Sequence, residues 1–111
     1  MAKGNSKLSK GGGGSTPVQS VRVNDFDVSK ATGEYIAQTI YAVYRDRANG
    51  KSIVGDVNLV NMTSGKRKNA ISKAEKNINI IERNLDAGRG DAADLQRQLE
   101  LWRRVINKLN G

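Results

Sequence analysis

The residues best suited to chemistry in this chain are cations that gather in one short segment. Lys66-Arg67-Lys68 are consecutive, and Lys73 and Lys76 follow about one turn apart in a predicted helix. A helix start with free N–H groups and nearby Lys or Arg side chains suits an anion such as phosphate. Because the helix dipole disfavours each cation at this end by about 0.3–1 kcal/mol, we expect these side chains to serve a purpose besides folding.

Other kinds of chemistry are excluded by composition, since the chain has no Cys and no His. It therefore has no disulfide, thiolate nucleophile, Cys/His zinc site, His-based triad or imidazole acid–base group. Asp25 and Asp27 share a face of an extended segment, but no third ligand of calcium-binding spacing follows them. The glycines at 11–14 lack the downstream Gly-Lys-Ser/Thr of a phosphate loop. We expect a protein that is not an enzyme and has no cofactor or metal.

The charge balance indicates what kind of partner the cations meet. There are 19 Lys and Arg against 11 Asp and Glu, a net charge of +8. The excess lies in two places: residues 1–15 hold three lysines and no acid, and residues 63–76 hold five cations against one carboxylate. The expected function is therefore non-specific contact with nucleic-acid phosphates, although charge alone fits an acidic protein surface as well. The candidate nucleic-acid-binding residues are Lys66, Arg67, Lys68, Lys73, Lys76, Arg103, Arg104, Lys108, Lys3, Lys7 and Lys10.

Two runs of apolar residues at heptad-like spacing predict the element that carries these cations. The first run is Ile71, Ala74, Ile78, Ile81 and Leu85, and the second is Ala92, Leu95, Leu99, Trp102, Ile106 and Leu109. The connection is short, with Gly88 placed to end one helix and Asp91 to cap the next. We expect an antiparallel helical hairpin, coiled-coil-like, over residues 66–110. Its packing would bring residues 66–76 beside residues 102–110, so that both sets of cations form one basic end.

The apolar stripes of the hairpin are wider than two helices need. Leu101 and Val105 widen the second stripe, and Ile80 widens the first. A third element must cover this width, and a helix predicted at residues 32–47 is the natural candidate. A second chain could cover it instead, which would make a homo-oligomer. The alternative function is therefore a protein–protein interaction module, an assembly protein or an inhibitor of a host protein, that uses Ile80, Leu101 and Val105 to bind its partner.

The helix at residues 32–47 is predicted from one apolar face and from its caps. Thr32 is a plausible N-cap, and Asn49-Gly50 supplies a stop. A strand is the competing interpretation because Tyr, Ile, Thr and Val are good strand formers, but the caps and the length favour a helix. We expect Trp102, on the second seam, to pack in the core.

The remaining segments complete a mainly α architecture. Residues 18–28 and 51–62 are each extended or ambiguous, and together they could form a short two-stranded β ribbon. Residues 1–17 contain four consecutive glycines among Ser and Lys residues and are predicted to be a disordered basic leader. The expected organisation is this leader followed by a single helical domain at residues 18–111.

The first ten residues, MAKGNSKLSK, followed by glycines, resemble the openings of some small proteins encoded by phages and prophages. The resemblance implies a virion-associated or host-modulating accessory protein. The leader has no apolar run of the kind that a secretory signal requires. No stretch approaches the roughly 18 consecutive apolar residues of a membrane span. We therefore expect no membrane partner and a cytoplasmic location, in the host cytoplasm or in a virion.

Overall fold

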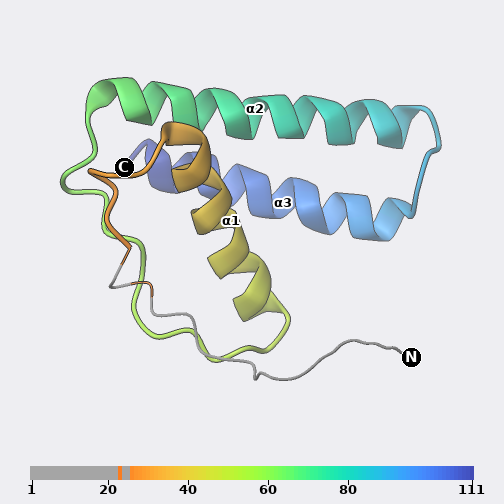
Figure 1. Ribbon diagram of the computed structural model, residues 1–111. Helices are drawn as coiled ribbons and strands as arrows, with labels where there is room; N and C mark the ends of the chain where they lie inside the picture. Colours follow the sequence, from red (N-terminus) through yellow and green to blue (C-terminus); the bar gives the residue numbers. More distant parts are fainter. Residues whose placement is uncertain (1–22, 24–25) are drawn as a thin grey trace, which may run out of the picture.

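The computed structural model describes residue 23 and residues 26–111 of the chain, which include three helices. They are α1 (Gly33–Ala48), α2 (Ser64–Asp86) and α3 (Ala92–Leu109). The helices α2 and α3 lie antiparallel and side by side, and α1 crosses this pair near the end that holds the C-terminus (Figure 1). The predictions of a mainly α fold, a C-terminal hairpin and a third covering helix are thus confirmed.

Local signals in the sequence determine where the helices begin and end. The Thr32 hydroxyl accepts a hydrogen bond from the Tyr35 backbone N–H at 3.1 Å, which caps α1 as expected. The carboxylate of Asp91 caps α3 by accepting from the Ala93 N–H. Gly88 follows the end of α2 with a φ of +69°, the left-handed conformation that glycine adopts without strain. The connection between α2 and α3 is therefore the one that the sequence predicts.

The start of α2 is two residues earlier than residue 66. Thr63 caps this helix, since its hydroxyl accepts from the Lys66 N–H at 3.2 Å. The basic run consequently occupies the first turn and a half of α2 rather than the approach to it. Gly33 at the start of α1 packs directly on this turn: a Cβ at Gly33 would lie 2.6 Å from the Lys66 carbonyl oxygen and 2.6 Å from the Asn69 Cβ. Only a residue without a side chain allows the two helices to approach this closely.

The core forms where the two heptad-like seams meet the apolar face of α1. The buried residues of α1 include Ile36, Ile40 and Val43. The hairpin contributes Ala70, Ala74, Ile81, Leu99, Trp102, Val105 and Leu109. The Trp102 ring stacks on that of Tyr41, with 4.3 Å between the centroids and 18° between the planes. The predicted core position of Trp102 is confirmed.

Residues 49–63 connect α1 to α2 without a helix or an extended strand in the described structure, although Val57 and Met62 are buried. The predicted β ribbon is not shown, and most of its other half, residues 18–28, lies outside the described residues, as does the predicted leader at 1–17. In the part of the chain that the structure describes, no helix combines the length and the apolar character needed to cross a bilayer.

Candidate functional site

Two of the three consecutive cations at the start of α2 bind backbone carbonyl groups of this same chain. The Lys66 ammonium donates to the carbonyl oxygens of Ser29, at 2.6 Å, and Val28, at 3.2 Å, in the segment that leads into α1. The Arg67 guanidinium donates to the carbonyl oxygen of Leu109 at the end of α3. Both side chains are half-buried. Their presence at a helix start is thus explained by contacts within the fold.

Carboxylates engage three more of the predicted site residues. Lys73 lies 3.7 Å from the Glu34 carboxylate, which comes from the first turn of α1. Lys108 reaches Asp56 at 3.3 Å, in the connection between α1 and α2. Arg103 pairs with Glu82 of α2 at 3.4 Å. These cations are at least partly neutralised before any partner arrives.

Arg104 is held by an aromatic ring instead. Its guanidinium carbon lies 4.5 Å from the centroid of the Tyr44 ring on α1, a cation–π contact. Burial raises the pKa of the Tyr44 hydroxyl above its ordinary value, with a smaller contribution in the same direction from the Asp56 charge. Arg104 therefore helps to attach α3 to α1.

The antiparallel packing brings the ends of α2 and α3 together, as the contact between Arg67 and Leu109 demonstrates. The predicted cations nevertheless point to separate neighbours, on α1, on α2 and on the connecting segment. Among the interactions of the described residues, Lys68, Lys76 and Arg104 are the predicted site residues with no acidic or carbonyl partner, and of these Arg104 is held by the Tyr44 ring. Lys3, Lys7 and Lys10 lie outside the described residues.

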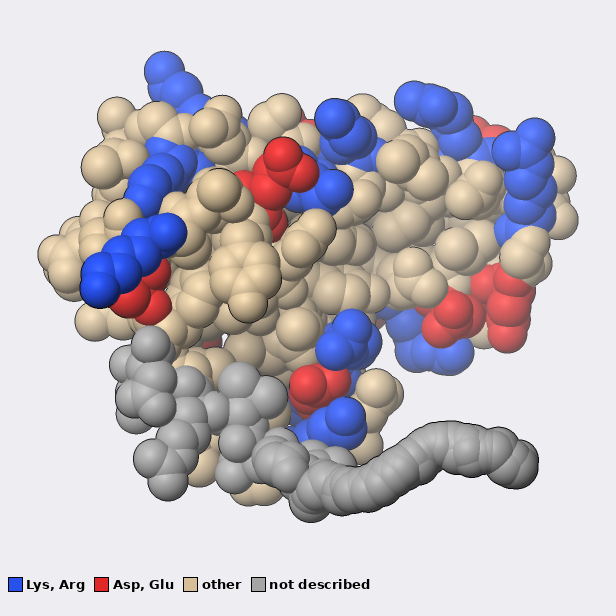
Figure 2. Space-filling view, viewed as in Figure 1, with Lys and Arg blue, Asp and Glu red and all other residues tan. Residues whose placement is uncertain are grey.

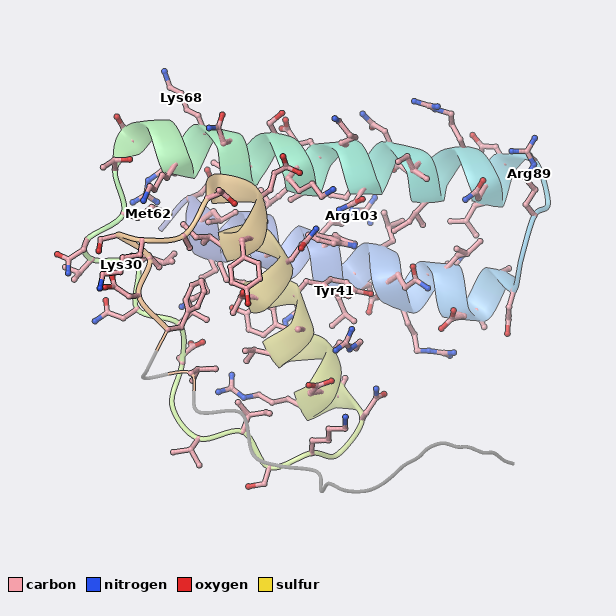
Figure 3. All side chains as sticks on the ribbon, in the orientation of Figure 1. Lys30, Tyr41, Met62, Lys68, Arg89 and Arg103 are labelled. Carbon is pink, nitrogen blue, oxygen red and sulfur yellow. The ribbon has the colours of Figure 1, made fainter. Side chains whose placement is uncertain are left out.

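Lys68 and Lys76 belong to an exposed line of hydrogen-bond donors along α2. We name this line the donor stripe; its members are Lys68, Ser72, Lys76, Asn79 and Arg83. Their spacing of 4, 4, 3 and 4 residues places them on one face of the helix, away from its apolar seam. Lys and Arg side chains line the outer edge of α2 in Figure 2, and Lys68 extends away from the helix bundle in Figure 3.

Sequence reasoning missed Ser72, Asn79 and Arg83 as members of this surface. The available signal was the helical spacing of polar donors, which repeats like the apolar seam but on the opposite side of α2. Arg89 lies at the hairpin turn, at the other end of α2 from Lys68 (Figure 3). Like Lys68 and Lys76, Arg83 and Arg89 have no acidic partner among the described interactions.

A line of carboxylates runs beside the donor stripe. Glu75 and Glu82 are 7 residues apart on α2 and occupy the neighbouring face of the helix, and Asp86, 18 residues after Lys68, lies in line with the stripe just beyond Arg83. Glu82 is the one that Arg103 binds. This acidic line limits the favourable surface for an anion to the donor stripe and the side of α2 that faces α1.

A hollow of about 370 Å³ opens on that side, between the start of α1 and the donor stripe. Its lining includes Ser72, Lys73 and Lys76 from α2 and Gly33 and Glu34 from α1. The Glu34 carboxylate lies at the N-terminus of α1 and pairs with Lys73, so it already supplies the negative charge that this helix end favours. The hollow is therefore the border of the donor stripe rather than an anion site of its own.

The fold buries two of the three predicted partner-binding residues and leaves the third exposed. Val105 is 0% exposed and Leu101 is 9% exposed. Because α1 covers them, these two side chains form no open apolar surface in the folded chain, which corrects the expectation for them. Ile80 is 44% exposed. A second hollow, of about 380 Å³, lies between α1 and α3 with Leu101 and Tyr41 in its lining.

The described residues contain no group of three Asp or Glu side chains placed to hold a metal ion. Comparison with known proteins identified no matching family model, curated protein or solved structure. The resemblance of the first residues to phage and prophage proteins therefore stays a prediction. What the geometry offers chemically is hydrogen-bond donation and positive charge along an exposed helix face.

Proposed function

We propose that this protein is a non-enzymatic binder of nucleic acid that contacts phosphates through the donor stripe. The observation that supports this most is the contrast between engaged and unengaged cations. Lys66, Arg67, Lys73, Arg103 and Lys108 each bind a carbonyl or a carboxylate within the chain. The exposed cations of the donor stripe have no such partner among the described interactions, and they share one helix face.

The donor types fit phosphate contact. Lys and Arg supply charge, and the short polar side chains of Ser72 and Asn79 lie between them. Hydroxyl and amide groups of this kind commonly donate to phosphate oxygens. Such contacts position a protein on nucleic acid without reading the base sequence of the nucleic acid. At a rise of 1.5 Å per residue, the stripe from Lys68 to Arg83 is about 22 Å long. We expect binding that is independent of sequence and sensitive to salt.

The leader lysines belong to this proposal as additional charge. Lys3, Lys7 and Lys10 bring three cations with no acid among residues 1–15. Basic segments of this kind add salt-dependent affinity for a phosphate backbone. Under the proposal the partner is nucleic acid of any sequence, and a cytoplasmic or virion location would give the protein access to it.

The test is a matched pair of double variants with the same change in net charge. Lys76→Gln with Arg83→Gln removes two donor-stripe cations. Lys51→Gln with Arg97→Gln removes two exposed cations elsewhere, which pair with Asp46 and Asp94. Fluorescence anisotropy with a labelled 20-base-pair duplex, repeated over a salt series, measures both. Far-ultraviolet circular dichroism establishes that each variant is folded.

The donor-stripe variant should bind about tenfold more weakly and should reduce the slope of log K against log salt by about 1.8, or 0.9 for each lost phosphate contact. The control variant should change the slope by much less. Equal losses in the two variants would mean that overall charge, not the donor stripe, carries the binding. Unchanged affinity in the donor-stripe variant would refute the proposal.

The alternative function is docking of an acidic protein surface in the hollow between α1 and α3. The observation in its favour is that three arginines line this hollow against two carboxylates, with the half-buried Tyr41 ring among them; the charged residues are Arg45, Arg97, Arg104, Asp94 and Glu100. A complex with an apolar contact at its centre would persist at high salt, whereas phosphate contact weakens steeply. Light scattering of the chain with its partner across a salt series separates the two functions.

A further inference from the structure

We infer that the donor stripe prefers double-helical nucleic acid to single strands. This inference rests on the proposed function and goes beyond it by naming the form of nucleic acid. Three features of the molecule favour a duplex: the positions of the aromatic side chains, the rigidity of the row of donors and the carboxylates near it.

Every aromatic side chain of the chain is accounted for in the structure, and none lies on α2. Trp102 and Tyr41 stack on each other in the core. Tyr44 is covered by the Arg104 guanidinium. Phe26 is half-buried, with its ring centroid 5.7 Å from that of Tyr35. The one largely exposed ring, Tyr35 at 57%, belongs to α1.

The absence of aromatic rings from the donor stripe matters because single strands are held largely by stacking. Proteins that bind them without sequence preference combine a basic groove with aromatic side chains on which successive bases stack. The donor stripe has cations, a hydroxyl and an amide but no ring. An unpaired base would gain no stacking contact on this surface, and its attraction would be limited to its phosphate.

The row of donors is also straight and rigid, because all five members belong to one continuous helix whose buried face packs on α1 and α3. A duplex carries one charge per 1.7 Å of its axis with both strands counted and is stiff over this length, so the length of about 22 Å beside the stripe holds about 13 phosphates that are already ordered, of which the nearer ones face the donors. A flexible single strand would lose conformational freedom when it is straightened along the row. The double helix therefore loses less entropy for the same contacts.

The carboxylates reinforce this geometry. Glu75 lies beside the stripe on α2 and Asp86 lies at its end, so both repel a backbone that leaves the row of donors. A stiff duplex can rest on the donor stripe alone, with its nearer phosphates over Lys68, Lys76 and Arg83. A collapsed single strand would place phosphates near both lines. Attraction and repulsion together thus favour a straight, regular phosphate backbone.

The experiment compares four labelled probes with the full-length chain at one salt concentration: a 20-base-pair DNA duplex, a 20-base-pair RNA duplex, dT20 and U20. At least one duplex should bind five times or more tightly than both single strands. Lys76→Gln with Arg83→Gln should remove most of this difference, and circular dichroism should show that the variant remains folded. Similar affinity for the two duplexes supports recognition of double-helical phosphates in general. A preference for one duplex shows whether the bound nucleic acid is DNA or RNA.

Single strands bound as tightly as the duplexes, or more tightly, would overturn the inference and leave the proposed function standing. No binding to any of the four probes would overturn both. A second variant tests the stacking argument directly: Asn79→Tyr adds a ring to the stripe and should raise the affinity for dT20 more than that for the duplex. An equal effect on both probes would contradict the inference that the lack of an aromatic ring on the donor stripe disfavours single strands.

Discussion

The Arg67 guanidinium donates to the backbone carbonyl of Leu109, and this contact joins the first turns of α2 to the last turn of α3. The last carbonyl groups of a helix have no intrahelical donors, and they carry a partial negative charge. Antiparallel packing places this negative end beside the positive end of α2. A cation that the dipole of its own helix disfavours is therefore stabilised by the dipole of the neighbouring helix.

Replacing Arg67 should consequently cost stability. We expect Arg67→Gln to lower the free energy of unfolding by about 1–2 kcal/mol, because it removes the charged hydrogen bond from the half-buried Arg67 side chain to the Leu109 carbonyl. Urea denaturation measures this change. The neighbouring variant Lys68→Gln is the control, since Lys68 is exposed, and it should stay within about 0.5 kcal/mol of the wild type.

The same pair separates a structural cation from a binding one. Lys68→Gln should weaken duplex binding while leaving stability unchanged, and Arg67→Gln should do the reverse in protein that is still folded. If Lys68→Gln proves the more destabilising of the two, the role assigned to Arg67 is incorrect.

Two glycines provide a second matched comparison. A Cβ at Gly33 would lie 2.6 Å from the Lys66 carbonyl oxygen, whereas a Cβ at Gly65 would have nothing within 4 Å. Gly33→Ala should destabilise the protein by about 1–3 kcal/mol, because α1 must move away from α2. Gly65→Ala should stabilise it by about 0.4–1 kcal/mol by reducing the freedom of the unfolded chain. Thermal melts of the two variants should shift in opposite directions, and a shared direction would argue against the close approach of the helices.

The stability of the fold should decline at alkaline pH because of two half-buried tyrosines, Tyr41 and Tyr44. Burial raises the pKa of the Tyr41 and Tyr44 hydroxyls above their ordinary value of 10.0. In the unfolded chain these groups lose their protons first, so the free energy of unfolding falls as the pH rises above about 10 and on through the higher pKa of the folded state. Urea denaturation at pH 9 and pH 11 measures the decline.

The variant Tyr41→Phe with Tyr44→Phe should show a shallower decline, since it keeps the rings and removes the ionisable groups. Tyr35→Phe changes the most exposed tyrosine and controls for the loss of one hydroxyl. An identical slope in the double variant and in the wild type would exclude these two hydroxyls as the cause.

The carboxylates beside the donor stripe should weaken binding in the wild type. Glu75→Gln removes one negative charge next to Lys76, and we expect about a twofold gain in duplex affinity at moderate salt. Glu100→Gln, an exposed carboxylate on α3, is the matched control and should have little effect. Anisotropy titrations at two salt concentrations compare them, and a gain at Glu100 as large as that at Glu75 would place the bound backbone elsewhere.

The helices of this protein are determined largely by signals that lie within a few residues of each boundary. The hydroxyl of Thr32 and the carboxylate of Asp91 cap their own helices, and Gly88 adopts a positive φ directly after α2. The heptad-like spacing of apolar residues then requires the two long helices to pair. Such features depend on near neighbours in the chain, and they could therefore be predicted from the sequence.

The tertiary structure alone decided which cations remain available to a partner. Lys66 binds carbonyls 37 and 38 residues away, Arg67 binds one 42 residues away, and Lys108 pairs with a carboxylate 52 residues away. No local pattern encodes these distances, because they arise from the way α1 and its flanking segments pack on the hairpin. The sequence locates positive charge along the chain, but whether a given charge is neutralised depends on what the fold places beside it.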